Sequence, residues 1–214
     1  MFSFYMHNLN NIDDELQNFY REKGFGNTIG KRIRFVKVYT GCLLVPFPNI
    51  ETRNRYLKFH DLHHIITGYS VGRIGEGEMS AWELGSGSMH RNPLIGVMNL
   101  IAISTGWLLD RRKIWEAFCS GNRSKNLYSR EIRMSIENGQ WSSIEEISDQ
   151  VLEYNPTKKI NFLKRLEYGF YIAISLFIHF TVAIPAVVLR YFSDVKSGHG
   201  LIGSLKPEIR KDIY

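Results

Sequence analysis

Four side chains in one short stretch of the chain have the types and the spacing of metal ligands: His60, Asp61, His64 and Glu76. On a helix, residues four apart lie above one another, so His60 and His64 present two imidazoles to the same point. Asp61 can lean toward that point as a carboxylate ligand. Glu76 follows after several glycines, which allow the chain to turn and to bring the start of the next helix alongside. These residues predict a metal site between two helices.

Two imidazole nitrogens and two carboxylate oxygens favour Zn²⁺, with Fe and Mn as alternatives. Mg²⁺ fits less well, because it prefers oxygen ligands and water. His63 is left out of the ligand set, since it lies about 60° around the helix from His60, and we predict that it is a polar surface residue. Asp61 and Glu76, where the metal does not fully engage them, are the candidate catalytic groups that move a proton.

Three other kinds of site use similar residues. Residues 60–64 resemble a metalloprotease motif with Asp in place of Glu, but such a protease needs a Glu base on the same helix. They also resemble one histidine box of a membrane desaturase, which needs two further boxes. The histidines outside the segment are isolated from one another: His7, His90, His179 and His199. A His-Asp phosphohydrolase needs another upstream His and a downstream Asp, and only His7 lies upstream.

The complete motif, His60-Asp61-x-x-His64 followed by eleven residues and Glu76, resembles the signature of the coenzyme Q biosynthesis protein 4 family. A motif with this fixed gap is far more specific than a histidine pair. The flanking residues that also match are Arg55, Tyr56, Gly68, Gly75 and the triplet Asn126-Leu127-Tyr128 before a charged helix. The resemblance covers about residues 30–155.

The resemblance implies an all-helical protein of ubiquinone biosynthesis that binds Zn²⁺ or another divalent ion through the four positions. Proteins of that family handle polyprenylated benzene-ring intermediates. They are linked to removal of the ring carboxylate with hydroxylation at the same carbon, and to organising the biosynthetic complex at a membrane. The implied partners are a prenylated lipid, a membrane surface and other quinone-biosynthesis proteins, and a homodimer is compatible with them. A non-catalytic prenyl-lipid-binding or scaffold protein is the alternative function.

The elements that must position the motif are helices. Caps and glycines predict helices over residues 11–23, 47–67 and about 75–84. Residues 31–45 alternate basic and apolar side chains and are the one stretch with a strand-like pattern, although we favour a helix there. The expected fold is therefore all-α, with a single helical domain over residues 1–157 and the metal site between two of its helices.

Residues 93–109 carry no charge and predict an apolar helix that lines a tunnel for a prenyl chain or forms part of the core, two roles that do not exclude each other. In the tunnel interpretation, small residues leave room on one side: Gly96, Ala102 and Gly106. The walls would be Leu94, Val97, Ile101 and Leu108.

Residues 158–214 form a second segment, with a basic start, an apolar helix and a tail. Residues 168–189 hold no Asp, Glu, Lys or Arg and reach the length that crosses a bilayer. His179 and Pro185 within them are costly in lipid, so a buried core helix and a helix dipped into one leaflet are the alternatives. We expect association with a membrane in one of these forms.

Basic residues surround the metal motif and can meet an anionic head group, although a solvated basic face is the simpler explanation of each: Arg53, Arg55, Lys58 and Arg73. Lys and Arg outnumber Asp and Glu by 27 to 21, a surplus that is common near anionic membranes. No nucleic-acid-binding signature is present, so nucleic acid is not an expected partner.

The predicted location is the cytoplasm, at the inner face of the cell membrane. The isolated cysteines Cys42 and Cys119 indicate a reducing compartment. The N-terminal residues show neither a secretory signal nor an Arg-rich transit peptide.

Overall fold

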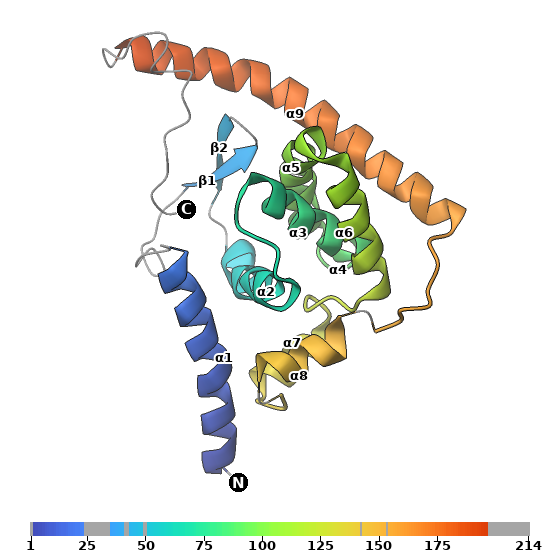
Figure 1. Ribbon diagram of the computed structural model, residues 1–214. Coiled ribbons are helices and arrows are strands. Elements are labelled where there is room, and N and C mark those ends of the chain that lie inside the picture. The colour runs from blue at the N-terminus through green and yellow to red at the C-terminus, as the bar shows by residue number, and fades with distance from the viewer. Residues whose placement is uncertain are drawn as a thin grey trace.

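The computed structural model describes residues 2–23, 35–40, 43–48, 51–141, 143–152 and 154–196. Within these ranges the chain is predominantly helical, which confirms the predicted fold class (Figure 1). The helices are α1 (Phe2–Glu22), α2 (Glu51–Thr67), α3 (Arg73–Gly85), α4 (Ser88–Arg91), α5 (Pro93–Leu109), α6 (Arg111–Arg123), α7 (Arg130–Glu137), α8 (Ile144–Val151) and α9 (Phe162–Lys196). A hairpin of β1 (Phe35–Thr40) and β2 (Leu43–Pro48) is the exception.

The helix predicted over residues 31–45 is wrong where the structure describes this segment. Strands β1 and β2 pair antiparallel, with Phe35 opposite Pro48 and Val38 opposite Val45. The alternation of basic and apolar side chains has the period of a strand, and the β-branched valines favour the extended conformation. The remaining residues of the prediction lie outside the described ranges.

Helices α1 and α2 begin elsewhere than predicted. Helix α1 starts at Phe2 and not at Asn11, because apolar residues at helical spacing continue upstream of Asn11. Helix α2 starts at Glu51, since Phe47 and Pro48 belong to β2.

The end of α2 and both ends of α5 agree with the predictions. After Thr67, Gly68 has a φ of 72°, a left-handed conformation that favours glycine. Its N–H donates to the carbonyl of His64 at 3.0 Å. Helix α5 spans 93–109, with the side chain of Asn92 accepting from the first backbone N–H groups. Local chain chemistry therefore explains these boundaries.

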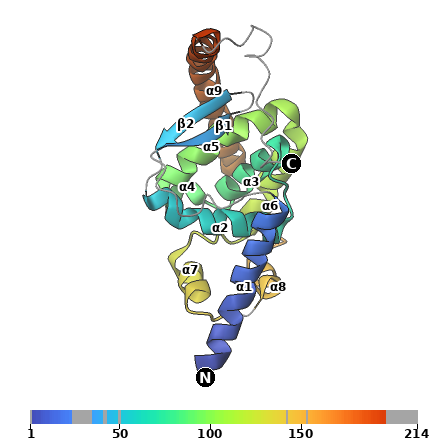
Figure 2. The ribbon, with the colours of Figure 1, turned by 90° about the vertical axis from the view of Figure 1, so that its left-hand side faces the viewer.

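Helix α3 lies at the centre of the molecule, between α5 and α6 (Figures 1 and 2). It crosses α5 where Gly77 meets Gly106, and a Cβ added to Gly77 would lie 2.6 Å from the Cα of Gly106. Only glycine permits such a close approach of two backbones. On the other side, α3 packs on α6, where Gly85 meets the backbone of Phe118 and Gly121 meets that of Trp82, and both of these aromatic side chains are fully buried.

Two of the three small residues of α5, Gly96 and Gly106, do not leave the space beside them that was expected for a prenyl chain. Gly106 is used in the crossing with α3, and Gly96 packs so closely on Met89 that an added Cβ would lie 2.7 Å from the Met89 Cα. Val97 and Leu108, which were expected as tunnel walls, are exposed. Helix α5 is a core helix, which was the other interpretation of its uncharged sequence.

Helix α9 lies along the outer side of α5, and its first turns reach α6 (Figures 1 and 2). The hydroxyl of Ser175 donates to the carbonyl of Leu100 at 2.5 Å. The Nδ1 atom of His179 lies 3.0 Å from the hydroxyl of Ser104 on α5, so this histidine has a polar partner inside the domain. Among the residues that the structure describes, no helix has both the length and the apolar character needed to cross a membrane.

Candidate metal centre

Helices α2 and α3 bring three of the four predicted ligands together. The nearest donor atoms of His60, His64 and Glu76 all lie within 4.8 Å of one another. The Nε2 atom of His60 lies 3.7 Å from one carboxylate oxygen of Glu76, and the Nε2 atom of His64 lies 3.6 Å from the other. The two imidazoles stand one helical turn apart on α2, as the spacing predicts.

The turn between the helices depends on a glycine next to the predicted ligand. Glu76 occupies the first turn of α3, where its N–H donates to the carbonyl of Gly72 at 2.8 Å. Gly75 fits against Ser70, and an added Cβ would lie only 1.9 Å from the Ser70 carbonyl oxygen. Glycine at position 75 therefore lets the turn pass close enough for Glu76 to face α2.

Both histidines are oriented by partners on their Nδ1 atoms. The Nδ1 of His60 lies 2.9 Å from a carboxylate oxygen of Glu83, and the Nδ1 of His64 lies 2.9 Å from the carbonyl oxygen of Tyr69. These acceptors hold the proton on Nδ1 and leave each Nε2 lone pair directed at Glu76. The Nε2 of His64 is buried, and no residue of the described ranges forms a hydrogen bond with it. A buried acceptor of this kind calls for a cation or another donor.

The spacing of the donor atoms fits a single ion. Ligand atoms that lie about 2.0–2.1 Å from Zn²⁺ at tetrahedral angles are separated by roughly 3.4 Å. The separations of 3.6 and 3.7 Å, each from one imidazole Nε2 to the nearer of the two Glu76 oxygens, approach this value, and the three ligand atoms as a set lie within 4.8 Å. The side chain of Glu76 is 39 % exposed, so the site opens to solvent on that side. Three protein ligands with an open side are typical of a catalytic rather than a purely structural metal site.

Glu83 is the functional residue that the sequence interpretation missed. Its side chain is completely buried, and one carboxylate oxygen contacts His60, His63 and the hydroxyl of Tyr128 at 2.9, 2.7 and 2.6 Å. The other oxygen accepts from the side-chain amide of Asn99 at 2.8 Å. The available signal was its position two helical turns after Glu76, on the same face of α3.

His63 is not the surface residue that was predicted. It is fully buried between Trp82 and Tyr128. Its Nδ1 lies 2.7 Å from Glu83, and its Nε2 accepts from the backbone N–H of Leu127 at 3.1 Å. The prediction is wrong because α3 and the segment after α6 cover this face of α2. His63 therefore supports the site without facing the three ligands.

Asp61 is buried beside the site but is not part of the group of three. Its carboxylate accepts a hydrogen bond from the hydroxyl of Tyr20, on α1, at 2.9 Å. Burial raises the pKa of Asp61, although the charges of His60 and His64 act in the opposite direction. Its roles as fourth ligand and as a proton-transfer group stay predictions.

The charges in this cluster shift pKa values in opposite directions. Burial favours the neutral form of Glu83, but His60 and His63 hold the pKa of this carboxyl well below its usual range. Burial also opposes ionisation of Glu76, yet His64 and His60 lower its pKa to about 2. Burial lowers the pKa of His63, in agreement with a neutral imidazole that accepts at Nε2. Both glutamates are negative at neutral pH. Glu76 faces the Nε2 atoms of His60 and His64 and can share a cation with them, whereas Glu83 lies on the Nδ1 side of His60.

The basic residues near the motif are only partly described. Lys58 forms an ion pair with Asp13 at 2.6 Å and so joins α2 to α1. Arg73 is exposed at the start of α3. The side chains of Arg53 and Arg55 lie outside the described residues, as does Cys42.

No protein-family model matches this chain, and no curated protein or solved structure is significantly similar to it.

Proposed function

We propose that this protein is a metal-dependent enzyme that handles a polyprenylated lipid in ubiquinone or quinone biosynthesis. Its reaction would be removal of the ring carboxylate as carbon dioxide, with a proton taking its place on the ring carbon. The hydroxylation at the same carbon that the resemblance implies would follow as a separate oxidation, which needs dioxygen and a two-electron reductant. The observation that carries the proposal is the convergence of His60, His64 and Glu76 on one point. The sequence motif that resembles the coenzyme Q biosynthesis protein 4 family places these residues at the same spacing. The proposed metal is Zn²⁺, with Fe, Mn and Mg as alternatives.

The burial and hydrogen bonding of the cluster support a preorganised site. Glu83 fixes the ring of His60, and the carbonyl of Tyr69 fixes the ring of His64, so neither imidazole has to reorient on binding. The partly exposed Glu76 leaves the substrate an approach from solvent. A bound divalent ion supplies a Lewis acid that holds a ring oxygen and stabilises the negative charge left when carbon dioxide departs.

Asp61 is suited to the proton transfer that decarboxylation needs. When the bond to the carboxylate breaks, its electron pair stays on the ring carbon, which then takes up a proton. Burial raises the pKa of Asp61, and the hydroxyl of Tyr20 fixes the side chain beside the metal ligands. In this proposal Asp61 donates the proton, while Glu76 and the histidines position the ring.

A non-catalytic prenyl-lipid-binding or scaffold protein is the second candidate. The close packing of Gly96 and Gly106 leaves no chamber for a long chain beside these two glycines, so the prenyl chain would lie elsewhere on the protein. In this version the metal holds a head group and the protein presents the lipid to other biosynthetic proteins.

The test begins with the metal content of purified protein, measured by mass spectrometry. We expect about one divalent ion per chain, and loss of that ion in His64→Ala and Glu76→Ala. His90→Ala is the matched control, since His90 is exposed on α4. Full metal content in both ligand variants would overturn the site.

The reaction is tested separately by incubating metal-loaded protein with a prenylated hydroxybenzoate and identifying the products by mass spectrometry. The enzyme proposal expects a product without the carboxylate from the wild type and from His90→Ala, and none from Glu76→Ala. Tight binding of the compound with no change in its mass would favour the scaffold function. If the compound is neither bound nor converted, both the enzyme proposal and the scaffold proposal are overturned.

A further inference from the structure

Helix α9 exposes a row of large hydrophobic side chains on the face that points away from the domain. Their exposed fractions run from 53 % at Leu166 to 72 % at Phe162. The row consists of Phe162, Leu163, Leu166, Phe170, Phe177 and Phe180. At 3.6 residues per turn these positions fall within about 100° of one another, so they form one continuous face. Single exposed apolar residues are normal on soluble proteins, but a contiguous row marks an interaction surface.

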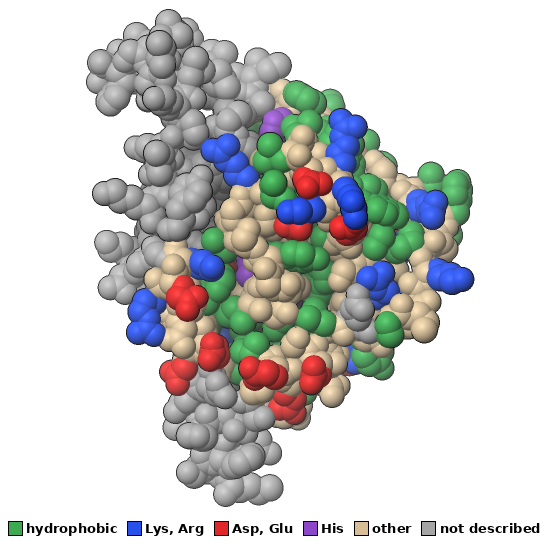
Figure 3. Space-filling model, viewed as in Figure 1, with side chains coloured by type: hydrophobic (Ala, Val, Ile, Leu, Met, Phe, Trp, Pro, Cys, Tyr) green, Lys and Arg blue, Asp and Glu red, His purple; other side chains and the backbone are tan. Residues whose placement is uncertain are grey.

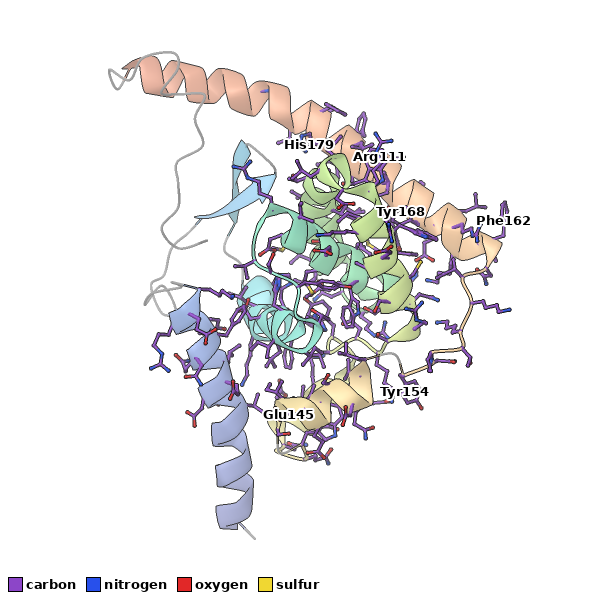
Figure 4. All side chains as sticks on the ribbon, viewed as in Figure 1. Arg111, Glu145, Tyr154, Phe162, Tyr168 and His179 are labelled. Carbon is purple, nitrogen blue, oxygen red and sulfur yellow. The ribbon has the colours of Figure 1, made fainter. Side chains whose placement is uncertain are left out.

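Helix α9 is apolar on its inner side, where Tyr171 and Ile172 are buried in the core, and it is apolar again on its outer side. Its buried polar side chains point inward, where Ser175 donates to Leu100 and His179 contacts Ser104. Figure 4 shows Tyr168 and His179 directed at the neighbouring helices, whereas Phe162 projects away from them. A helix that packs an apolar face on the protein and also turns phenylalanines outward is expected to have a non-aqueous environment on its outer side.

Positive charge lies at the end of α9 where the apolar row begins. Lys159 and Arg165 are exposed there, and the adjoining Lys158 and Lys164 contact Asn122 and Glu167. Figure 3 shows Lys and Arg side chains beside hydrophobic ones at the right-hand edge, where this helix starts. Beyond this end, residues 168–189 carry no charge.

We propose that the outer face of α9 lies in the interface of a bilayer that contains anionic lipids. The phenylalanines would enter the boundary between head groups and acyl chains, and Lys159 and Arg165 would meet the phosphates. Because the inner face of α9 is packed on α5, the helix lies along the membrane surface. A second copy of the chain is a poorer occupant, since the chain carries a net charge of +6 and has the same basic end on each copy. This inference stands on α9 alone and is independent of the metal site.

The test is co-sedimentation of the full-length protein with phosphatidylcholine vesicles, with and without phosphatidylglycerol. We expect binding to the anionic vesicles that weakens at high salt. Phe170→Ser and Phe177→Ser should each reduce the partition coefficient about tenfold, because each removes a phenylalanine from the apolar phase. Both residues are exposed, so folding and metal content should be unchanged.

Met134→Ser and Tyr154→Ser are the matched controls, because these residues are exposed hydrophobics outside α9. They should bind vesicles as the wild type does. The combined change of Lys159 and Arg165 to Gln should remove most of the preference for phosphatidylglycerol. Absence of vesicle binding by the wild type, or unchanged binding by both phenylalanine variants, would overturn the proposal. A dimer in sedimentation analysis that Phe177→Ser dissociates, without vesicle binding, would assign the face to self-association instead.

Discussion

Replacing Glu83 with Gln tests whether the buried carboxylate organises the metal centre. The side chain has four hydrogen-bond contacts, to His60, His63, Tyr128 and Asn99. Glutamine has the same shape but only one acceptor oxygen. If this oxygen takes the place that faces His60, the new NH₂ group points at the NH₂ group of Asn99, and one buried donor loses its acceptor.

The size of the effect follows from these contacts. A buried donor without an acceptor costs about 1–3 kcal/mol, and hydrogen bonds to a charged acceptor are roughly twice as strong as neutral ones. We therefore expect Glu83→Gln to lower the free energy of unfolding by roughly 3 kcal/mol. Weaker support of His60 should also reduce metal affinity about 10–100-fold. Since native domains have about 5–15 kcal/mol of stability, the variant should still fold.

Two measurements check this prediction on the same preparations. Urea denaturation of the metal-free protein gives the free energy of unfolding, and competition with a chromophoric chelator gives the metal affinity. Glu78→Gln is the matched control, because Glu78 is on the same helix but is only partly buried. It should leave both quantities nearly unchanged. Wild-type affinity and stability in Glu83→Gln would refute the assignment of Glu83 as the organising residue.

Three further predictions concern the same core. His63→Ala should lower the free energy of unfolding by about 2 kcal/mol and should also lower metal affinity, because it leaves the N–H of Leu127 without its acceptor. Urea denaturation and chelator competition measure the two quantities, and His90→Ala should change neither. Gly106→Ala should destabilise the protein by about 1–3 kcal/mol in urea, since its methyl group would meet Gly77 at 2.8 Å; an unaltered denaturation midpoint would disprove this contact. In metal-free protein, the folded-state pKa of Glu83 lies below its unfolded-state pKa of about 4.3. The ionised side chain therefore stabilises the folded protein fully above about pH 4.3, and this stabilisation is lost as the pH falls from there through the folded-state pKa. The stability difference between wild type and Glu83→Gln should thus shrink below about pH 4 in urea titrations, and a constant difference down to acid unfolding would contradict the pKa shift.

The helices that carry the candidate ligands could be predicted from the sequence because their signals are local. Two histidines four residues apart share a helix face wherever the helix packs, and Gly68 ends α2 through its own backbone conformation. The 93–109 helix has a capping Asn92, a proline at its start and a capping Asp110 at its end. The turn that brings Glu76 to His60 and His64 is likewise short and rich in glycine.

Other features depended on contacts between segments that are distant in the sequence. Glu83 is joined to Tyr128 and Asn99, and Asp61 to Tyr20 on α1, and no periodicity of one helix reveals such partners. The same applies to the glycines of α5. From the sequence alone, a glycine on α5 can either leave space for a ligand or allow another helix to pack closely. In the structure Gly106 has the second role, because α3 packs against it at Gly77.

The predominantly helical fold and the convergence of His60, His64 and Glu76 follow from local sequence, because helix period and turn chemistry act over a few residues. The burial of His63, the support of His60 by Glu83, and the exposure of the apolar row on the described part of α9 follow from the packing of the whole domain. These properties depend on which surfaces meet. A side chain on a given helix face is in water or in the core according to the neighbour that packs there, and that neighbour is supplied by a distant part of the chain.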